Sequence, residues 1–463
     1  MTAEKTIKGP SSERPINRLK SMYPLRALVD ETYKDTLASA KAKMPVAWSM
    51  LDFGFYPPIL NALDIDAVYP ENYGTVCASS GVATPFLERS ESEGFPTHLC
   101  GYAQNCYGYS AKMFHDLDGQ IPPEAPQGGM PKPIVLLASG AACDARFKWF
   151  QALGRYLDAP VWALESPRPQ AKESLIEGAH QRELAFLEKE LREFITFMER
   201  LVGKKMDWDK FAEDISASQE MDAVWYGITD ELRVARPCPM HSRDHFSAMN
   251  SSLFRAKDPV RVKKLYQDMY DEVKGRVERG EAGINRPEKY RVAFFGLAPW
   301  HALGLFDRLA ERGWNFVRED YHSPSPMPHL ADVKDPLEKL IRYRHRGTRH
   351  QVEEEFPPEE AEQVITEIVE KGHSSKLSAR VARKYRLDGV IFHSNMTCRT
   401  MSGNQNNRQK NLLDAYKVPS LIIEGDIVDA RLFDMEGTMR RCEAFEETMQ
   451  HYREVRKGEG MEW

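Results

Sequence analysis

The sequence has no apolar run that approaches the ~20 residues needed to cross a bilayer. Its first residues, MTAEKTIKGPSSERP, are polar and lack the apolar core of a signal peptide. Basic residues are not in excess either, since the formal net charge is -6 over 463 residues, whereas nucleic-acid binding needs a concentrated basic face. The densest basic run, residues 342–350, is interpreted as a solvated loop. We therefore expect a cytoplasmic protein that binds neither membranes nor nucleic acid.

Cysteine is scarce as well, with seven residues in the whole chain. So few cysteines in so long a sequence do not form a disulfide framework of the kind found in small secreted domains. In a reducing compartment these thiols remain free for packing, metal binding or catalysis. The position of each cysteine relative to the predicted strands and helices is therefore the most informative feature of the sequence.

The length and the apolar pattern predict more than one α/β domain. Short apolar runs of the kind that form parallel strands covered on both faces alternate with helical segments. Strands are expected at residues 45–50, 67–70, 133–139, 160–164, 290–296, 315–317, 389–393 and 419–424. This alternation is typical of doubly wound parallel sheets.

The pattern divides the chain into three parts. Residues 1–169 are predicted to form an N-terminal α/β domain that carries Cys100 and Cys143. Residues 170–288 have no convincing strand and consist of long, charged amphipathic segments, which predicts a helical insert. Residues 289–463 are predicted to form a C-terminal α/β domain that carries Cys398.

Three cysteines occupy similar places in these predicted elements. Cys143 and Cys398 each follow a buried strand and precede a helix, and Cys100 opens another predicted helix. In parallel α/β sheets, sites form where strand-to-helix loops meet at the carboxyl ends of the strands. Helix N-termini also stabilise thiolates and anionic clusters through their backbone N–H groups and dipole.

Three thiolates from separate loops suit a [4Fe–4S] cluster that leaves one iron open to another ligand. Their spacing matches no ferredoxin motif, so two alternatives stay open from the residues alone: small buried thiols at strand ends, or a zinc site. Cys106 competes with Cys100, although it is expected to point away from the loop. The remaining cysteines are interpreted as packing residues: Cys77, Cys238 and Cys442.

Several segments carry a resemblance when their order and content are taken together. The chain resembles the larger subunit of the 2-hydroxyacyl-CoA dehydratase and benzoyl-CoA reductase family. The similarity runs through most of the predicted α/β portions, whereas the helical insert resembles the family only in character. The segments are VAWSM, DAVYPENYG, CGYAQNCYGYSA, CDARFKWFQALGRYLDAPVWALESP, DGVIFHSNMTCR and VPSLIIEGDIVDARLFDMEGTMRRCEAF.

The resemblance implies a [4Fe–4S] cluster held by Cys100, Cys143 and Cys398. It also implies a heterodimer with a second homologous iron–sulfur subunit, an acyl-CoA substrate, and electrons supplied by an ATP-hydrolysing iron–sulfur activator. The sequence contains no GxxxxGK[ST] motif, which agrees with the use of ATP by a separate chain.

Two chemistries belong to the resembled family, and we favour an ATP-dependent benzoyl-CoA reductase that delivers low-potential electrons to an aromatic acyl-CoA. The alternative is a subunit of an (R)-2-hydroxyacyl-CoA dehydratase, in which a ketyl radical expels the 2-hydroxyl group. A third hypothesis is a non-catalytic partner that relays electrons or has a structural role.

Four further residues are candidates for the active site. By resemblance, Ser49 lies where a hydroxyl can bond near the thioester carbonyl, and Glu71 where a carboxylate can act as acid or base. His393 is proposed to donate a proton to the substrate, and His301 to approach a CoA phosphate. Three of the four also have a purely structural interpretation: a backbone-bonded hydroxyl for Ser49, helix capping for Glu71 and a partly buried cap for His301.

Overall fold

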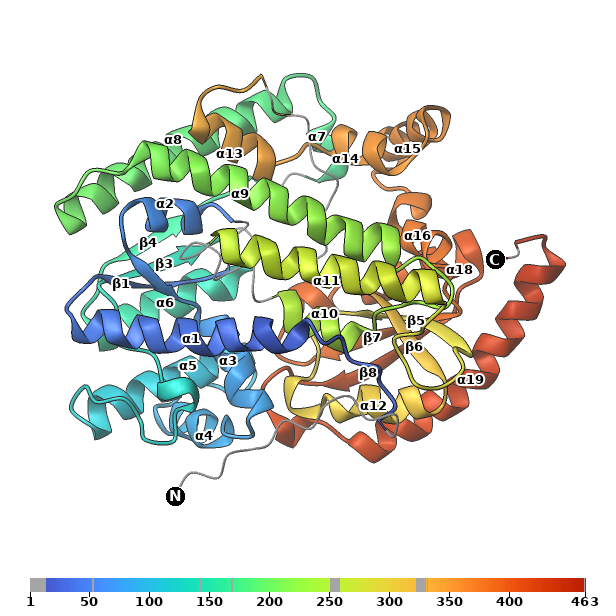
Figure 1. Cartoon of the computed structure of the whole chain (residues 1–463), viewed down its shortest axis with the longest axis horizontal. Coiled ribbons are helices and arrows are strands. Elements are labelled where there is room, and N and C mark those ends of the chain that lie inside the picture. Colours follow the sequence, from blue (N-terminus) through green and yellow to red (C-terminus); the bar gives the residue numbers. More distant parts are fainter. Residues whose placement is uncertain are drawn as a thin grey trace.

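The computed structural model describes residues 14–51, 54–140, 143–167, 170–249, 259–321, 330, 332–461 and 463. Two parallel four-stranded sheets lie side by side and are surrounded by helices (Figure 1). The predicted α/β fold is therefore confirmed. None of the helices in the described ranges is long and apolar enough to cross a membrane.

The first sheet has the strand order β2-β1-β3-β4. Every residue of its two central strands, β1 and β3, is buried, which explains their continuous apolar sequences. All neighbouring strands are parallel. The strands are β1 (Val46–Ser49), β2 (Asp66–Val68), β3 (Val135–Ser139) and β4 (Val161–Leu164).

The second sheet has the order β6-β5-β7-β8 and repeats the topology of the first. Its strands are also all parallel. They are β5 (Tyr290–Phe295), β6 (Trp314–Glu319), β7 (Gly389–Asn395) and β8 (Ser420–Gly425). All eight strands occur where the sequence pattern predicts them.

The first sheet is accompanied by α1 (Met22–Lys41), α2 (Tyr56–Ala62), α3 (Pro70–Ser79), α4 (Thr84–Ser92), α5 (Gly101–Ala111) and α6 (Asp144–Leu157). The described part of residues 170–288 contains α7 (Ala171–Ser174), α8 (Ala179–Val202), α9 (Trp208–Tyr226), α10 (Ser242–Ala248) and α11 (Pro259–Arg279). The second sheet is accompanied by the 3-10 turn η5 (Trp300–Ala302) and by α12 (Gly304–Glu311), α13 (Pro336–Arg344), α14 (Thr348–Glu355), α15 (Pro358–Lys371), α16 (Ser375–Lys384), α17 (Arg399–Ser402), α18 (Gln405–Tyr416) and α19 (Met435–Gly458).

Helix α13 belongs to the connection between β6 and β7, yet it packs against α8 and α9 of the helical insert (Figure 1). Its buried residues Leu337, Leu340 and Ile341 share one apolar cluster with Leu187 and Leu191 of α8. The basic run 342–350 is thus not a loop, because its ends lie in α13 and α14. The interpretation of this run as a solvated loop was wrong.

One hydrophobic core joins the two sheets. Trp48 and Leu136 of the first sheet belong to the same buried cluster as Phe294, Phe316 and Ile391 of the second. The shared core holds the sheets in a defined relation. Loops from both sheets can therefore build one site.

Candidate functional site

Each of the three predicted cluster cysteines is the residue immediately before a helix. Cys100 precedes α5, Cys143 precedes α6 and Cys398 precedes α17. Cys143 follows β3 and Cys398 follows β7, which have the same place in the order of the two sheets. None of the three side chains makes a capping hydrogen bond, and all three are partly exposed. Their sulfur atoms are therefore available as ligands.

The Cys100 and Cys398 loops are joined by hydrogen bonds between their neighbouring residues. The backbone N–H of Gly101 donates to the hydroxyl of Thr397 over 3.0 Å, and this hydroxyl donates to the carboxylate of Asp426. Gly101 is required for this approach, because a Cβ atom there would lie 2.5 Å from Asp426 Oδ1. These hydrogen bonds hold the loops of Cys100 and Cys398 against each other.

The Cys143 and Cys398 loops are joined by an ion pair between the residues that follow the cysteines. Arg399 Nη2 lies 2.8 Å from Asp144 Oδ2, and both side chains are largely exposed. An ion pair in solvent adds little stability. It nevertheless shows that the third loop meets the other two, so three segments distant in sequence converge.

The three thiols also interact electrostatically. Burial raises the pKa of Cys100 and the Cys398 sulfur raises it further, whereas the backbone N–H of Ala103 lowers it. Burial likewise raises the pKa of Cys398, and Cys143 adds to that increase. Converging thiolates repel one another, and a positively charged metal centre relieves this repulsion when it replaces their protons.

The spacing of the sulfurs bears on the kind of metal centre. Among the described residues, the one group of three His, Cys, Asp or Glu ligand atoms within 4.8 Å of one another lies elsewhere, so at least one pair of these sulfurs is farther apart. Thiolates on a single zinc ion, with Zn–S bonds of ≈2.3 Å, lie only about 3.8 Å apart. The donor set therefore fits a multi-iron cluster better than a single ion.

Glu71 lies beside the cysteines but is not a free carboxylate. It occupies the first turn of α3, where Arg146 donates to Oε1 over 2.9 and 3.0 Å and to Oε2 over 2.8 Å. Oε2 also accepts the backbone N–H of Leu51 over 2.7 Å. Arg146 belongs to the helix that begins after Cys143, so this buried ion pair orients the start of α6. A role of Glu71 as acid or base stays a prediction.

Aromatic side chains lie close to this region: Tyr102 and Trp300 are buried, and Tyr321 is partly exposed. Tyr102, next to Cys100, accepts a hydrogen bond from Trp300 Nε1 over 2.5 Å and lies 3.2 Å from the Thr75 hydroxyl. Burial raises the pKa of Tyr102 and of Tyr321, and the charge of Glu71 adds to both shifts. Both phenols are therefore protonated at neutral pH.

Ser49 is buried at the end of β1, and His393 is buried inside β7, two residues before its end. Ser49 donates to the carbonyl of Met50 over 3.0 Å, so its hydroxyl is bonded to backbone. His393 Nδ1 donates to the carbonyl of Leu297 over 2.5 Å, and its Nε2 has no hydrogen-bond partner among the described residues. Burial lowers the pKa of His393 to about 4, so at neutral pH its Nε2 is an acceptor rather than a donor. Catalytic roles for both residues stay predictions.

His301 is bonded to the loop that follows β8. Its Nε2 donates to the carbonyl of Asp426 over 2.9 Å, and its ring packs against Phe433. Burial lowers its pKa, which keeps the imidazole neutral. Binding of a CoA phosphate by His301 stays a prediction.

The other four cysteines are fully buried. Cys77, Cys106 and Cys442 belong to the hydrophobic core that joins the sheets. Cys238 lies in a separate apolar cluster and donates to the carbonyl of Met240 over 3.3 Å. Their sulfur atoms are enclosed by apolar side chains, whereas Cys100, Cys143 and Cys398 are partly exposed, which separates these four thiols from the proposed ligands.

Comparison with known proteins adds to this geometry. The chain matches the family described as 2-hydroxyglutaryl-CoA dehydratase, D-component, over residues 53–449. It belongs to this family. The resemblance stated from the sequence segments is thereby confirmed.

Relatives within the dehydratase family align along nearly the whole chain. The (R)-2-hydroxyisocaproyl-CoA dehydratase alpha subunit of Clostridioides difficile is 23% identical over 434 residues, covering 93% of this chain and 97% of the relative. The alpha subunit of (R)-2-hydroxyglutaryl-CoA dehydratase of Acidaminococcus fermentans is 21% identical over 490 residues, with 92% and 96% covered. A benzoyl-CoA reductase subunit of Thauera aromatica is 24% identical over 370 residues, with 77% and 78% covered. These relatives favour the dehydratase alternative over the reductase preferred from the sequence.

Sequence reasoning missed several residues that build the site of this family member. Arg146, Thr397 and Asp426 hold the cysteine loops but were not among the candidates. A signal for each was present, since Thr397 and Asp426 lie in loops that follow predicted strands and Arg146 lies in the first turn of the helix after one, where sites of parallel sheets form. Their partners could not be assigned because each pairs with a residue distant in sequence.

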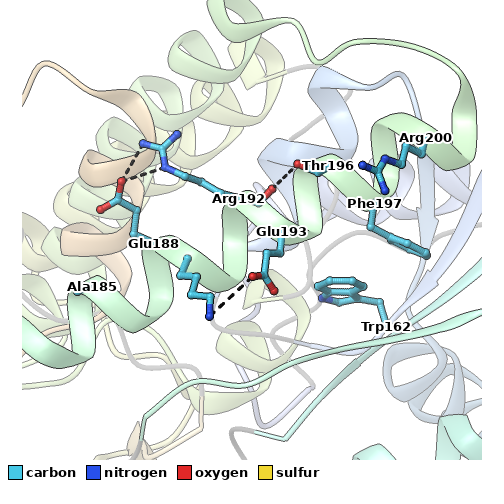
Figure 2. A pocket seen from close by; sticks show the side chains of 9 residues that line it. Trp162, Ala185, Glu188, Arg192, Glu193, Thr196, Phe197 and Arg200 are labelled. Atoms are coloured by element: carbon cyan, nitrogen blue, oxygen red, sulfur yellow. Dashed lines mark hydrogen bonds and ion pairs between the residues drawn. The ribbon is translucent and has the colours of Figure 1, made fainter.

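A surface groove of about 730 Å³ lies away from the cysteines, between α8 and β4 (Figure 2). Trp162 and Phe197 stack at its base with ring centroids 5.0 Å apart. Its polar rim consists of ion pairs along one helix, including Arg192 with Glu188 at 2.8 Å. Exposed pairs of this kind are typical of a solvated helix surface.

Proposed function

We propose that this chain is the [4Fe–4S]-binding subunit of an (R)-2-hydroxyacyl-CoA dehydratase, with Cys100, Cys143 and Cys398 as the cluster ligands. The observation that supports it is the convergence of three uncapped thiols on loops that are bonded to one another. The names of the dehydratase relatives, which align over more than nine-tenths of their length, supply the substrate class.

A bound cluster would supply single low-potential electrons to the acyl-CoA thioester. The protein residues contribute position and environment. The N-termini of α5 and α6 direct their dipoles towards the anionic sulfurs. The Glu71–Arg146 ion pair fixes the start of α6, and Tyr102 with Trp300 excludes water from the inner side. A dry, rigid surround protects a radical reaction from quenching.

Two protein partners are part of the proposal. The relatives are named as subunits of their enzymes, so we propose a second, similar subunit that completes the enzyme. We also propose an ATP-hydrolysing iron–sulfur activator, which the family resemblance implies; the lack of a GxxxxGK[ST] motif in this chain agrees with the use of ATP by a separate protein. The exposed Met396, close to Cys398, offers part of a surface that such a partner can contact.

The experiment is anaerobic purification followed by iron and acid-labile sulfide analysis and an assay with activator and 2-hydroxyacyl-CoA. We expect about four irons per chain and a brown protein. A colourless protein with about one zinc and no sulfide would contradict the cluster.

Benzoyl-CoA reductase is the second candidate, favoured by the 24% identity to the Thauera aromatica subunit of that enzyme. Assaying the same complex with benzoyl-CoA separates the two functions. Dehydration of a 2-hydroxyacyl-CoA without ring reduction supports the first proposal, and ring reduction alone supports the second.

A non-catalytic relay subunit makes a different prediction. If the chain only transfers electrons, Glu71→Gln and Ser49→Ala would leave turnover intact, whereas Cys143→Ser would abolish it. A fall in turnover in Glu71→Gln at unchanged iron content would support a direct contribution of this chain to the active site.

A further inference from the structure

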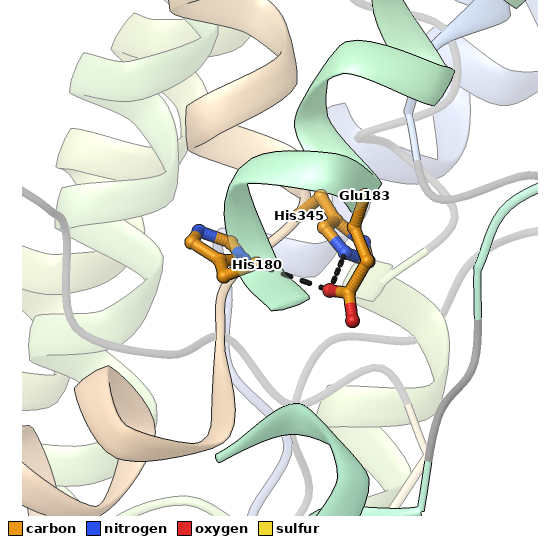
Figure 3. Close-up of side chains that lie close together, drawn as sticks. All are labelled: His180, Glu183 and His345. Atoms are coloured by element: carbon orange, nitrogen blue, oxygen red, sulfur yellow. Dashed lines mark hydrogen bonds and ion pairs between the residues drawn. The ribbon is translucent and has the colours of Figure 1, made fainter. Parts of the chain in front are cut away.

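A second group of potential metal ligands lies outside the cysteine site. His180 and Glu183 of α8 and His345 at the end of α13 form a histidine–glutamate cluster (Figure 3). Their ligand atoms all lie within 4.8 Å of one another. No residue of this cluster belongs to the site proposed above.

The three side chains converge on one carboxylate oxygen. His345 Nε2 lies 2.8 Å from Glu183 Oε2, and His180 Nδ1 lies 3.6 Å from the same atom. The imidazole rings are nearly parallel, with an angle of 16° and centroids 5.7 Å apart. His180 Nδ1 is buried and has no hydrogen-bond partner among the described residues. Leaving a buried nitrogen without a hydrogen bond costs free energy. The hydrogen bond between Glu183 and His345 therefore does not explain the position of His180.

Local structure explains why these residues meet. His180 and Glu183 are three positions apart at the start of α8, which places them on one face of the helix. His345 ends α13 in an extended conformation, with φ -118° and ψ 102°, which turns the chain towards α8. Gly347 permits the close approach, because a Cβ atom there would lie 3.3 Å from His180 Cγ.

We propose that the histidine–glutamate cluster binds a divalent transition-metal ion of the zinc class. Two imidazoles and one carboxylate are a common zinc ligand set, whereas magnesium and calcium prefer oxygen ligands. Three protein ligands leave one tetrahedral position for water.

The charges around the cluster are compatible with a cation. Imidazole binds metal ions in its neutral form, and Glu183 brings a negative charge to the cluster. The arginines near the cluster have carboxylate partners: Arg342 pairs with Glu338 over 2.8 Å, Arg344 with Asp222 over 3.0 Å and Arg346 with Glu354 over 3.4 Å. On binding, His345 Nε2 exchanges its proton for the metal, and that proton leaves to solvent or moves to Nδ1.

An ion at this place would cross-link two parts of the fold. Helix α8 follows the first sheet, whereas α13 belongs to the connection between two strands of the second sheet. The ion would therefore fasten the second half to the helical insert, next to the apolar contact that already joins the two helices. Its role is structural rather than redox.

The test uses the full chain purified anaerobically with its iron content retained. Zn²⁺ is titrated against a chromophoric chelator, and the zinc environment is read by X-ray absorption. We expect one zinc bound by nitrogen and oxygen, without sulfur, and a higher Tm in its presence. Replacing a residue that only hydrogen-bonds a metal ligand lowers metal affinity by up to about 100-fold. His345→Ala removes a ligand itself, so we expect it to lower the zinc affinity by at least about 100-fold.

Two further variants keep the result interpretable. Glu183→Gln can still accept the hydrogen bond of His345, so it should fold normally yet lose most of the zinc affinity. His350→Ala is the matched control, because His350 also pairs with a glutamate, Glu354, at 3.0 Å, but lies outside the cluster. Absence of bound zinc, sulfur-only coordination, or equal affinity in His345→Ala and His350→Ala would each overturn the proposal.

Discussion

The two sheets have the same strand order, yet the halves that contain them contribute unequally to the cysteine site. Each half places one cysteine after the equivalent strand: Cys143 after β3 and Cys398 after β7. Only the first half adds another, Cys100, from the helices between β2 and β3. The corresponding connection of the second half, between β6 and β7, includes α13, which packs on the helical insert. The same sheet topology thus carries different functional residues in the two halves, because the connections between the strands differ.

The largest effect is expected from replacing Cys143 or Cys398, the two cysteines that follow equivalent strands. Either Cys→Ser variant should lose the bound iron and the activity, since both thiols are proposed ligands of one cluster. Iron analysis and anaerobic assay are the measurements. Cys442→Ala, which alters a core thiol, is the control and should retain its iron. Normal iron content in Cys398→Ser would show that the second half does not hold the cluster.

A second comparison concerns two buried ion pairs, one beside each sheet. Arg233 and Glu319 are almost completely buried, whereas Arg146 and Glu71 are about one-tenth exposed. Leaving a buried charge unpaired costs about 3–5 kcal/mol, so Glu319→Gln should lower the free energy of unfolding by that order and Glu71→Gln by less. Urea denaturation measures both. Equal losses would contradict the ranking by burial.

The halves should also differ in their response to pH. His393 of β7 lies five residues before Cys398, and the residue five positions before Cys143 is Ala138 of β3. Burial lowers the pKa of His393 from 6.5 to about 4, so between these values the unfolded chain binds more protons than the folded one. The free energy of unfolding should therefore rise with pH across this window, by about 3 kcal/mol for this group, and level off above it. Denaturation from pH 4 to 7 should show a smaller slope in His393→Gln.

The smallest effect is expected at Arg399–Asp144, one of the surface ion pairs between the two halves. Arg399→Ala removes the partner of Asp144, but both side chains are largely exposed, so stability should fall by less than about 1 kcal/mol. Thermal melting at low and high salt measures it. A loss of several kcal/mol would mean that this pair, rather than the shared core, holds the halves together.

Local patterns in the sequence were sufficient to predict the strands. Apolar runs such as residues 133–139 and 389–393 predicted β3 and β7, because burial on both faces requires continuous apolar sequence. The same patterns placed Cys143 and Cys398 at the carboxyl ends of strands. They misjudged residues 342–350, since charged residues with little apolar periodicity look alike in a loop and at helix ends.

Sequence alone therefore determined the fold class, the strand positions and which cysteines follow strands, since these depend on near neighbours in the chain. Only the tertiary structure decided that Arg146 pairs with Glu71, that Thr397 and Asp426 join two cysteine loops, and that His345 meets His180. Each of these contacts joins residues distant in sequence. Their pairing depends on how sheets and helices pack in space, which no local pattern encodes.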